Sequence, residues 1–356
     1  MPLFQNASYK ALVFIAFFFV VAVIDAHAAA PTSSPDAISA LGKQLFFDKH
    51  LSRDDSISCA SCHDPNIAFA DHHPLAIGIR GKTGARNTPS LMTAAGEHSF
   101  FWDGRRTTLE AQVLDPLVNP NEMGLDSVDQ AIQRVCDAPA LAEEFKRVFR
   151  SDVDETALRT ALAAFVKSLD GGITAFDRYM EGSSDALSAS AIRGLHLFEG
   201  KAGCSSCHSQ SDRPAKFSDG SYHHSGVSLS ADDVAALPRL VDAMLAIPID
   251  RIGIAVTQDS HLASLGRFAV TRDPKDIGAF KTPSLRNVAL TGPYMHDGSV
   301  PTLEKAVDIE IYYRSLSTGT VVDLTATDRT DIIAFLRSLT NDAYLGTENR
   351  AKPPAE

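Results

Sequence analysis

The stretch Cys59-Ala60-Ser61-Cys62-His63 decides how the rest of the chain is interpreted. Its C-x-x-C-H pattern is typical of c-type haem attachment, because two thiols about one helical turn apart add to the haem vinyl groups and the following His ligates the iron. A redox disulfide or half of a zinc site is the alternative for one such motif. The pattern recurs in Cys204-Ser205-Ser206-Cys207-His208. Two copies favour two haems, with His63 and His208 as proximal ligands.

Charge and the N-terminal stretch indicate an exported protein. A net charge of −11 over 356 residues argues against nucleic-acid binding. The apolar run from Ala11 to Ile24, with Lys10 before it and Ala26-His27-Ala28 after it, is typical of a secretory signal peptide over residues 1–28. An uncleaved anchor is the alternative, although the run is shorter than a typical membrane span. We expect a bacterial periplasmic protein with no membrane span after cleavage.

Helical patterns prevail and strand patterns are scarce, so the sequence predicts a mainly α fold. Ser34 followed by Pro35 is typical of a helix start. Residues Ser127 to Leu169 carry helical periodicity, and Cys136 inside this stretch is expected to be a small buried residue. Further helices are expected around Ala191–Phe198, Ser230–Ala246, Thr302–Arg314 and Thr327–Leu339.

An internal repeat organises the chain, because three short matches share one offset of 194 positions (282 − 88). The matches are Thr88-Pro89-Ser90-Leu91 with Thr282-Pro283-Ser284-Leu285, Asp103-Gly104 with Asp297-Gly298, and Thr108-Leu109-Glu110 with Thr302-Leu303-Glu304. We expect two homologous haem domains, residues 29–171 and 172–321, divided at Gly171-Gly172. We also expect the C-terminal helix, residues 322–346, to complete the first domain.

With these motifs in view, the chain resembles the bacterial dihaem cytochrome c peroxidases and the related MauG enzymes. The residues that carry the resemblance are Leu41-Gly42 to Phe47, both haem motifs, Arg86-Asn87-Thr88-Pro89, Phe101-Trp102-Asp103-Gly104-Arg105, Gly266-Arg267-Phe268-Ala269-Val270-Thr271 and Pro293-Tyr294-Met295-His296-Asp297-Gly298. The resemblance implies two cytochrome-c-like domains. The N-terminal haem would react with hydrogen peroxide, and the six-coordinate C-terminal haem would handle electrons.

The resemblance also implies catalytic residues at three positions. Gln112 and Glu122 match the polar pair beside the peroxide-reactive haem, where a carboxylate can take a proton from one peroxide oxygen and return it to the other. The alternative for Glu122, in Asn119-Pro120-Asn121-Glu122, is a solvated turn residue. Trp102, the only Trp of the chain, matches the family's relay between the haems. The alternative for Trp102 is a large core residue.

A calcium ion between the domains is a further implication of the resemblance. The matching positions are the side chain of Asn87 and the backbone carbonyls of Thr291 and Pro293. Hard oxygen donors of this kind suit calcium. The alternative is that Asn87 only shapes a turn.

Two positions depart from the peroxidases and resemble MauG. Ile79 stands where peroxidases carry a His that caps the resting N-terminal iron, and Ile79 has no donor atom. His72 and His73 could substitute for it, although exposed loop histidines are the simpler interpretation. Glu310 stands where peroxidases carry a Met ligand on the C-terminal haem, whereas MauG has a Tyr oxygen ligand there.

We therefore expect Glu310 to ligate the haem held by His208, with Tyr312 or Tyr313 as the alternative ligand. The matching position of the first repeat (310 − 194) is Pro116, which has no side-chain donor and leaves the first haem open. Glu310 could instead only pair with Arg314, one helical turn on.

The leading hypothesis is an oxidoreductase that uses hydrogen peroxide at the His63 haem. It either reduces peroxide with electrons from a small cytochrome c or cupredoxin, or oxidises side chains of a partner protein as MauG does. Ile79 and Glu310 favour the second version slightly. A dihaem electron carrier without peroxidase activity is the alternative from another class. It would hold two six-coordinate haems, which respond slowly to cyanide.

Overall fold

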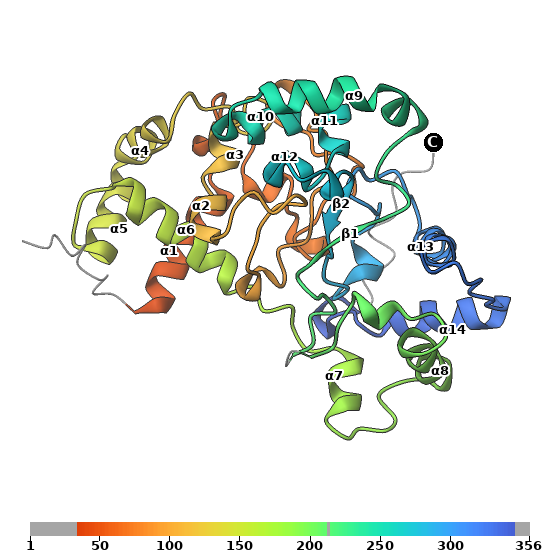
Figure 1. The fold of residues 1–356 in the computed structure, drawn as a ribbon. Coiled ribbons are helices and arrows are strands. Elements are labelled where there is room, and N and C mark those ends of the chain that lie inside the picture. Colours follow the sequence, from red (N-terminus) through yellow and green to blue (C-terminus); the bar gives the residue numbers. More distant parts are fainter. Residues whose placement is uncertain (1–33, 212–213, 346–356) are drawn as a thin grey trace, which may run out of the picture. The chain divides into compact units, whose positions relative to one another are not determined.

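The computed structural model describes residues 34–211 and 214–345, so the signal peptide expected over residues 1–28 lies outside the described residues. Helices dominate the chain (Figure 1), which confirms the mainly α fold. They are α1 (Pro35–Phe47), α2 (Leu109–Gln112), α3 (Asp115–Val118), α4 (Val128–Cys136), α5 (Pro139–Phe149), α6 (Glu155–Lys167), α7 (Ala175–Met180), α8 (Ala189–Glu199), α9 (Ala231–Ala246), α10 (Ile252–Gln258), α11 (Ser260–Ser264), α12 (Phe268–Thr271), α13 (Leu303–Thr318) and α14 (Ala326–Arg337). The strands β1 (Tyr222–His224) and β2 (Ala279–Lys281) pair in antiparallel fashion. No helix in the described ranges has both the length and the apolarity needed to cross a membrane.

Helix starts follow the capping residues in the sequence. The Oγ of Ser34 accepts the backbone N–H of Ala37 at 3.3 Å, and Pro35 occupies the first position of α1. Ser230 caps α9 in the same way and forms a capping box with Asp233. Each cap satisfies backbone N–H groups that the first turn of a helix leaves without a partner.

The periodic stretch from Ser127 to Leu169 forms three helices, α4, α5 and α6, instead of one. Pro139 starts α5, and Arg150 ends it in the left-handed conformation with φ of 59°. Cys136 is exposed at the end of α4, so the expectation of a buried thiol is wrong. The buried face of α4 carries Val135, and the next residue along an α-helix points about 100° away from it.

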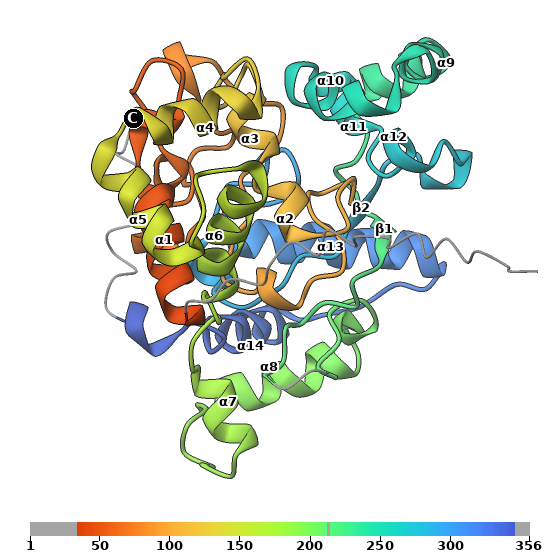
Figure 2. The same cartoon turned by 90° about the vertical axis from the view of Figure 1, so that its left-hand side faces the viewer.

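Two equivalent helix pairs form the two main cores. Helix α1 crosses α6 (Figure 2), and α8 crosses α14 (Figure 1). A Cβ on Gly42 of α1 would collide with the carbonyl oxygen of Ala161, and a Cβ on Gly194 of α8 would collide with that of Asp331. Glycine is therefore required at both crossings, because any side chain would force the helices apart. The same crossing in both halves agrees with an internal duplication.

Helix α14 packs in the second core, which corrects the expectation that residues 322–346 complete the first domain. The ring of Phe335 on α14 lies 5.1 Å from that of Phe198 on α8. Helical periodicity defines which face of a helix is apolar, but it does not identify the helix that packs against this face. Beyond α14, the hydroxyl of Tyr344 does reach the first half and donates to the carbonyl oxygen of Pro65 at 2.9 Å.

A third, smaller core is built by α9 to α12. This segment follows the second haem motif and contacts the first half of the chain, in part through two buried hydrogen bonds. The side-chain amide of Asn119 donates to Thr257 Oγ1 at 2.8 Å. Arg86 Nη2 donates to the carbonyl oxygen of Ala263 at 2.8 Å. The segment therefore covers residues that follow the first haem motif.

Candidate functional site

The first haem motif presents an oriented imidazole and two thiols. Phe69 O lies 3.0 Å from His63 Nδ1, so Nδ1–H donates to this oxygen and Nε2 keeps the lone pair that a metal needs. Burial lowers the pKa of His63, and its ring is therefore neutral at pH 7. Cys59 and Cys62 are free thiols, and burial raises the pKa of each to about 12. This donor set fits a covalently attached haem.

The second haem motif repeats this arrangement. The carbonyl oxygen of Phe217 lies 2.9 Å from His208 Nδ1, and burial lowers the pKa of His208. Cys204 and Cys207 are also free thiols, and burial raises the pKa of Cys204 to about 11. The residues of this motif fit a second haem, again with Nε2 as the free donor.

Three phenylalanine rings lie behind each ligand His in matching positions. They are Phe46, Phe69 and Phe165 in the first half and Phe198, Phe217 and Phe335 in the second. Ring centroids within the first set are 5.0 to 6.2 Å apart, and those within the second set are 5.1 to 6.2 Å apart. In each set one ring belongs to the residue whose carbonyl oxygen holds the imidazole, so core packing fixes the direction of the ligand atom.

The two repeat blocks meet through a reciprocal pair of backbone hydrogen bonds. Asn87 N–H donates to His296 O at 2.8 Å, and Lys281 N–H donates to Trp102 O at 2.9 Å. The two hydrogen bonds join equivalent positions of the repeat. Lys281 is the equivalent of Asn87 (87 + 194), and His296 is the equivalent of Trp102 (102 + 194). Trp102 Nε1 also donates to Asn87 O at 2.9 Å, while His296 stacks on Phe280 with centroids 3.8 Å apart. Trp102 therefore lies at the contact between the blocks, and its role as a relay remains a prediction.

Glu122 lies in the turn after α3, close to the first haem motif. Burial raises the pKa of its carboxyl to about 7, while the positive charge of Arg105 opposes the rise and Asp115 adds to it. The charge of Glu122 in turn helps to raise the pKa of both Cys59 and Cys62. The carboxyl is therefore within electrostatic reach of both thiols. Glu122 is half-buried, so it is less exposed than a fully solvated turn residue would be. Gln112, the other member of the predicted pair, ends α2 and is partly buried.

A buried ion cluster, which no sequence motif indicated, lies within electrostatic reach of Glu122. Asp103 is fully buried, and its carboxylate lies 3.1 Å from Arg105 Nη1 and 3.3 Å from Arg86 Nη1. Burial alone would raise the pKa of Asp103, but the two guanidinium groups hold it below its usual value. Arg105 also stacks over Phe101, with its guanidinium carbon 3.3 Å from the ring centroid. The positive charge near Glu122 is thus fixed by Asp103 and Phe101.

A second missed feature ties the Glu122 turn to α10. Asn119 O accepts the backbone N–H of Glu122 at 3.0 Å, and Asn119 Oδ1 accepts that of Asn121 at 3.0 Å. The Asn119 amide donates to the hydroxyl of Thr257, which donates in turn to a carbonyl oxygen of α10 at 2.9 Å. The Asx-turn pattern at Asn119 could have identified this residue from the sequence. No sequence pattern around Thr257 indicates its contact with Asn119.

Ile79 is buried and packs against the same turn. Its backbone N–H donates to Glu122 O at 3.0 Å, and a Cβ on Gly124 would collide with its side chain. His72 and His73 are exposed, as the simpler interpretation expected, and His73 Nδ1 lies 2.8 Å from an Asp71 carboxylate oxygen.

Glu310 lies near the second haem motif. Its charge helps to raise the pKa of both Cys204 and Cys207, and burial raises its own pKa. Glu310 is nevertheless exposed, so its side chain remains accessible to solvent. Arg314 donates to Ser206 Oγ at 3.0 Å instead of pairing with Glu310.

The alternative ligands lie on the same helix as Glu310. Tyr312 is exposed, and Tyr313 packs over Gly226, where a Cβ would collide with the phenol ring. Ligation by Glu310 remains a prediction, with the two tyrosines as its alternatives.

The structure places Asn87, one residue of the expected calcium site, beside the segment that contains the other two. The Asn87 amide donates to Pro74 O at 3.1 Å, and its backbone contact with His296 places it beside the segment that contains Thr291 and Pro293. Thr291 Oγ1 donates to the carbonyl oxygen of Val288 at 3.4 Å. Calcium binding stays a prediction.

Comparisons with known proteins agree with the geometry. A family model described as di-haem cytochrome c peroxidase matches residues 36–185. The chain is 35% identical over 320 residues to the methylamine utilization protein MauG of Methylorubrum extorquens, covering 88% of this chain and 80% of that protein. It is 32% identical to the cytochrome c551 peroxidase of Nitrosomonas europaea, covering 85% and 79%.

Among solved structures, a MauG-like protein associated with microbial copper homeostasis superimposes with a TM-score of 0.70 at 29% identity, covering 92% of this chain and 97% of that one. The diheme peroxidase BthA from Burkholderia thailandensis superimposes with a TM-score of 0.66 at 25% identity, covering 91% of each chain.

Proposed function

Because the chain belongs to the di-haem cytochrome c peroxidase family, we propose that it uses hydrogen peroxide at the haem held by His63, with Glu122 as the group that moves the proton. Family membership makes it an oxidoreductase with two c-type haems. The observation that carries the proposal is Glu122, a half-buried carboxyl within electrostatic reach of the thiols of the first haem motif, with a pKa that desolvation raises to about 7. We further infer export to the periplasm, and domains over residues 29–171 and 172–321 with α14 added to the second.

Haem iron bound through Nε2 of His63 would supply the Lewis acid and the electrons that break the O–O bond. Glu122 accepts a proton from one peroxide oxygen and returns it to the other, and a pKa near the working pH suits both steps. Arg105 keeps part of the Glu122 population ionised, and Asp103 holds Arg105 in place. Gln112 is the second polar group of this pocket. The net reaction takes one hydrogen peroxide, two electrons and two protons to two waters.

The source of the electrons separates two versions of this function. A small cytochrome c or cupredoxin could supply them, or side chains of a protein substrate could be oxidised, which is the MauG-like version. Glu310 favours the MauG-like version, because an anionic ligand from this residue would stabilise oxidised iron at the His208 haem, whereas a Met ligand raises the haem potential. Rapid peroxide turnover with a reduced cytochrome supports the first version, and a long-lived oxidised enzyme supports the second.

The proton-transfer role is tested by stopped-flow measurement of the peroxide reaction as a function of pH. The wild-type rate constant should rise with pH through an apparent pKa of about 7, because only ionised Glu122 accepts a proton. Glu122→Gln should lower the rate constant by about 10²-fold or more and remove this titration. Asp115→Asn should move the titration to lower pH, because the charge of Asp115 raises the pKa of Glu122.

A matched control is Glu143→Gln, an exposed carboxyl on α5 that should leave the profile unchanged. The same pH dependence in Glu122→Gln as in the wild type would refute the role of Glu122. A resting enzyme that binds cyanide only slowly at both haems would favour the electron carrier.

A further inference from the structure

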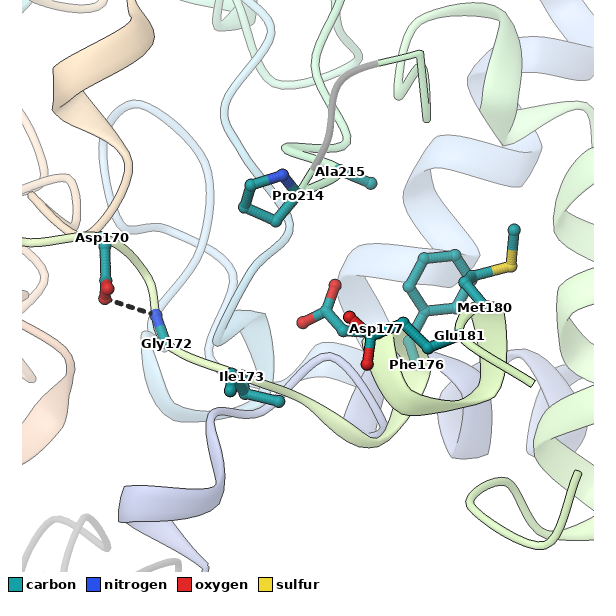
Figure 3. Close-up of a pocket in the computed structure, with 9 residues that line it drawn as sticks. All are labelled: Asp170, Gly172, Ile173, Phe176, Asp177, Met180, Glu181, Pro214 and Ala215. Atoms are coloured by element: carbon teal, nitrogen blue, oxygen red, sulfur yellow. Dashed lines mark hydrogen bonds between the residues drawn. The ribbon is translucent and has the colours of Figure 1, made fainter. Parts of the chain in front are cut away.

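A pocket of about 410 Å³ lies between α7 and the segment that follows the second haem motif. We name it the α7 pocket (Figure 3), and its lining includes Ile173, Phe176, Met180, Asp170, Asp177 and Glu181. None of these residues belongs to the group around His63 and Glu122 where the peroxide reaction is proposed. The pocket is lined in part by Pro214 and Ala215, which follow the second haem motif in the chain.

The α7 pocket combines an exposed apolar centre with carboxylates at its rim. Ile173 is 63% exposed and Met180 is 47% exposed, which is unusual for large apolar side chains that line one pocket. Asp170 and Glu181 are exposed at the rim, and Asp185 follows them in the loop after α7. An apolar patch with a negative rim is complementary to an apolar patch with a positive rim on another protein.

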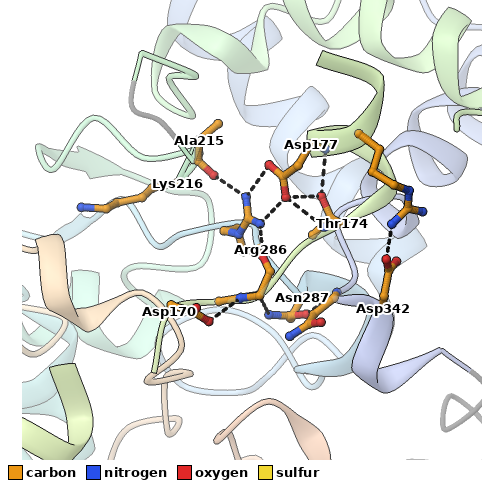
Figure 4. A network of polar contacts seen from close by, with 12 residues as sticks. Asp170, Thr174, Asp177, Ala215, Lys216, Arg286, Asn287 and Asp342 are labelled. Atoms are coloured by element: carbon orange, nitrogen blue, oxygen red, sulfur yellow. Dashed lines mark hydrogen bonds and ion pairs between the residues drawn. The ribbon is translucent and has the colours of Figure 1, made fainter. Parts of the chain in front are cut away.

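The walls of the α7 pocket are held by a buried polar network (Figure 4). The Arg286 guanidinium donates to Ala215 O at 3.0 Å and to Asp177 Oδ1 at 3.1 Å, and it also donates to Gly172 O. Asp177 in turn accepts from the hydroxyl of Thr174 at 2.8 Å. Arg286 is neutralised by Asp177, so the wall adds no positive charge to the rim, and the pocket is formed before any partner binds.

The lining of the α7 pocket is connected to His208 through two phenylalanine residues. The Phe176 ring lies 5.1 Å from the Phe217 ring, and the carbonyl oxygen of Phe217 holds His208 Nδ1 at 2.9 Å. A donor seated in the pocket would thus be separated from the imidazole by two side chains and one hydrogen bond. In the first half, a fourth phenylalanine ring, Phe47, also packs beside the three rings near the ligand His. Phe47 contacts Phe46 and Phe165, whereas Phe176 contacts the ring whose carbonyl oxygen holds the imidazole.

From this juxtaposition we propose that the α7 pocket is the docking surface for a small soluble redox protein whose cofactor edge is ringed by lysines. The inference rests on the version of the proposed function in which a small redox protein supplies the two electrons that each peroxide requires. Each docked donor would give up one electron, and Phe176 and Phe217 would lie on the route of that electron to the haem that His208 would hold. Two donor molecules are oxidised for each hydrogen peroxide reduced to two waters.

The test measures binding in the absence of peroxide. The probe is a basic mitochondrial-type cytochrome c, titrated into the holoenzyme by calorimetry at low ionic strength, where charge pairs are least screened. Asp170→Asn/Glu181→Gln should raise the dissociation constant about tenfold and reduce its salt dependence. The matched control is Asp129→Asn/Glu143→Gln, which removes two exposed carboxylates from α4 and α5 and should change the dissociation constant less than about twofold.

A second variant and a second readout test the apolar centre and the route. Ile173→Ser keeps every charge and should weaken binding at all salt concentrations. Stopped-flow reduction of the His208 haem by the reduced cytochrome, at subsaturating concentration, should slow about tenfold in the double carboxylate variant.

The outcomes are distinguishable from a failure of the proposed function. Equal dissociation constants in the wild type and Asp170→Asn/Glu181→Gln would overturn the docking surface. Equal weakening by the α4 and α5 control would overturn it too, because binding would then follow net charge alone. Absence of peroxide turnover in the wild type would instead refute the proposed function and leave the binding result standing.

Discussion

Replacing Asp103 by Asn should lower the free energy of unfolding by about 3–5 kcal/mol, because it leaves two buried guanidinium groups without their carboxylate. Asp103 is fully buried, and the side chains of Arg86 and Arg105 are 7% and 10% exposed. Water therefore has little access to either cation. Exposed ion pairs of the same chain, such as that between Arg329 and Asp308, should contribute at most about 1 kcal/mol.

The repeat provides a matched control in Asp297→Asn. Asp297 occupies the position of Asp103 in the second block, and its Oδ1 accepts the backbone N–H of Ser299 at 3.0 Å, as Asp103 accepts that of Arg105 at 3.1 Å. The positions equivalent to Arg86 and Arg105 are Phe280 and Ser299, so Asp297 has no guanidinium partners from these positions. Its replacement should cost about 1 kcal/mol or less.

The assay is urea unfolding of the holoprotein followed by far-ultraviolet circular dichroism across a range of pH. The pKa of Asp103 is lowered in the folded state, so its contribution is fully present above the unfolded value of about 4 and is lost as the pH falls through the folded value. The difference between wild type and Asp103→Asn should be constant from about pH 5 to 8 and shrink below about pH 4. A cost for Asp103→Asn no larger than that for Asp297→Asn would refute this reasoning.

Four further predictions follow from the sites. Trp102→Phe keeps most of the packing and should slow the sharing of oxidising equivalents between the haems, measured by freeze-quench spectroscopy; an unchanged rate would exclude the relay. Glu310→Met should raise the potential of the second haem by at least about 0.1 V, within the ~0.8 V range that axial ligands command. A shift of zero in potentiometry would rule out ligation by Glu310. Thr257→Val removes the hydroxyl that holds Asn119 and should displace the pH titration of the peroxide reaction while leaving the far-ultraviolet spectrum unchanged; a superimposable profile would show that this bond does not position Glu122. Elemental analysis should find one calcium per chain, and chelation should alter the haem spectra if Asn87 is a ligand, whereas a calcium-free protein with native spectra would contradict the site.

The sequence predicted local features well and distant partners poorly. Each C-x-x-C-H motif, the caps of α1 and α9, and each copy of the repeated blocks are encoded within a few residues, and the structure shows the caps and the equivalent contacts of the two blocks. The resemblance identifies Glu122 as a candidate, but the turn that contains it is tied to α10 by a hydrogen bond between Asn119 and Thr257, 138 positions apart. No local pattern reports such a contact. The same limit explains α14, whose apolar face was visible in the sequence while its partner, α8, was not.

The reciprocal contact between Asn87 and His296 and between Lys281 and Trp102 has the form of a two-fold homodimer interface within one chain. In an isologous interface each contact occurs twice, because residue i of one copy meets residue j of the other and the reverse also holds. A single-haem ancestor could therefore have paired with itself through this surface before duplication joined the copies. Once both copies were encoded separately, equivalent positions were free to diverge. Trp stands at one and His at the other, an asymmetry that an identical dimer could never acquire.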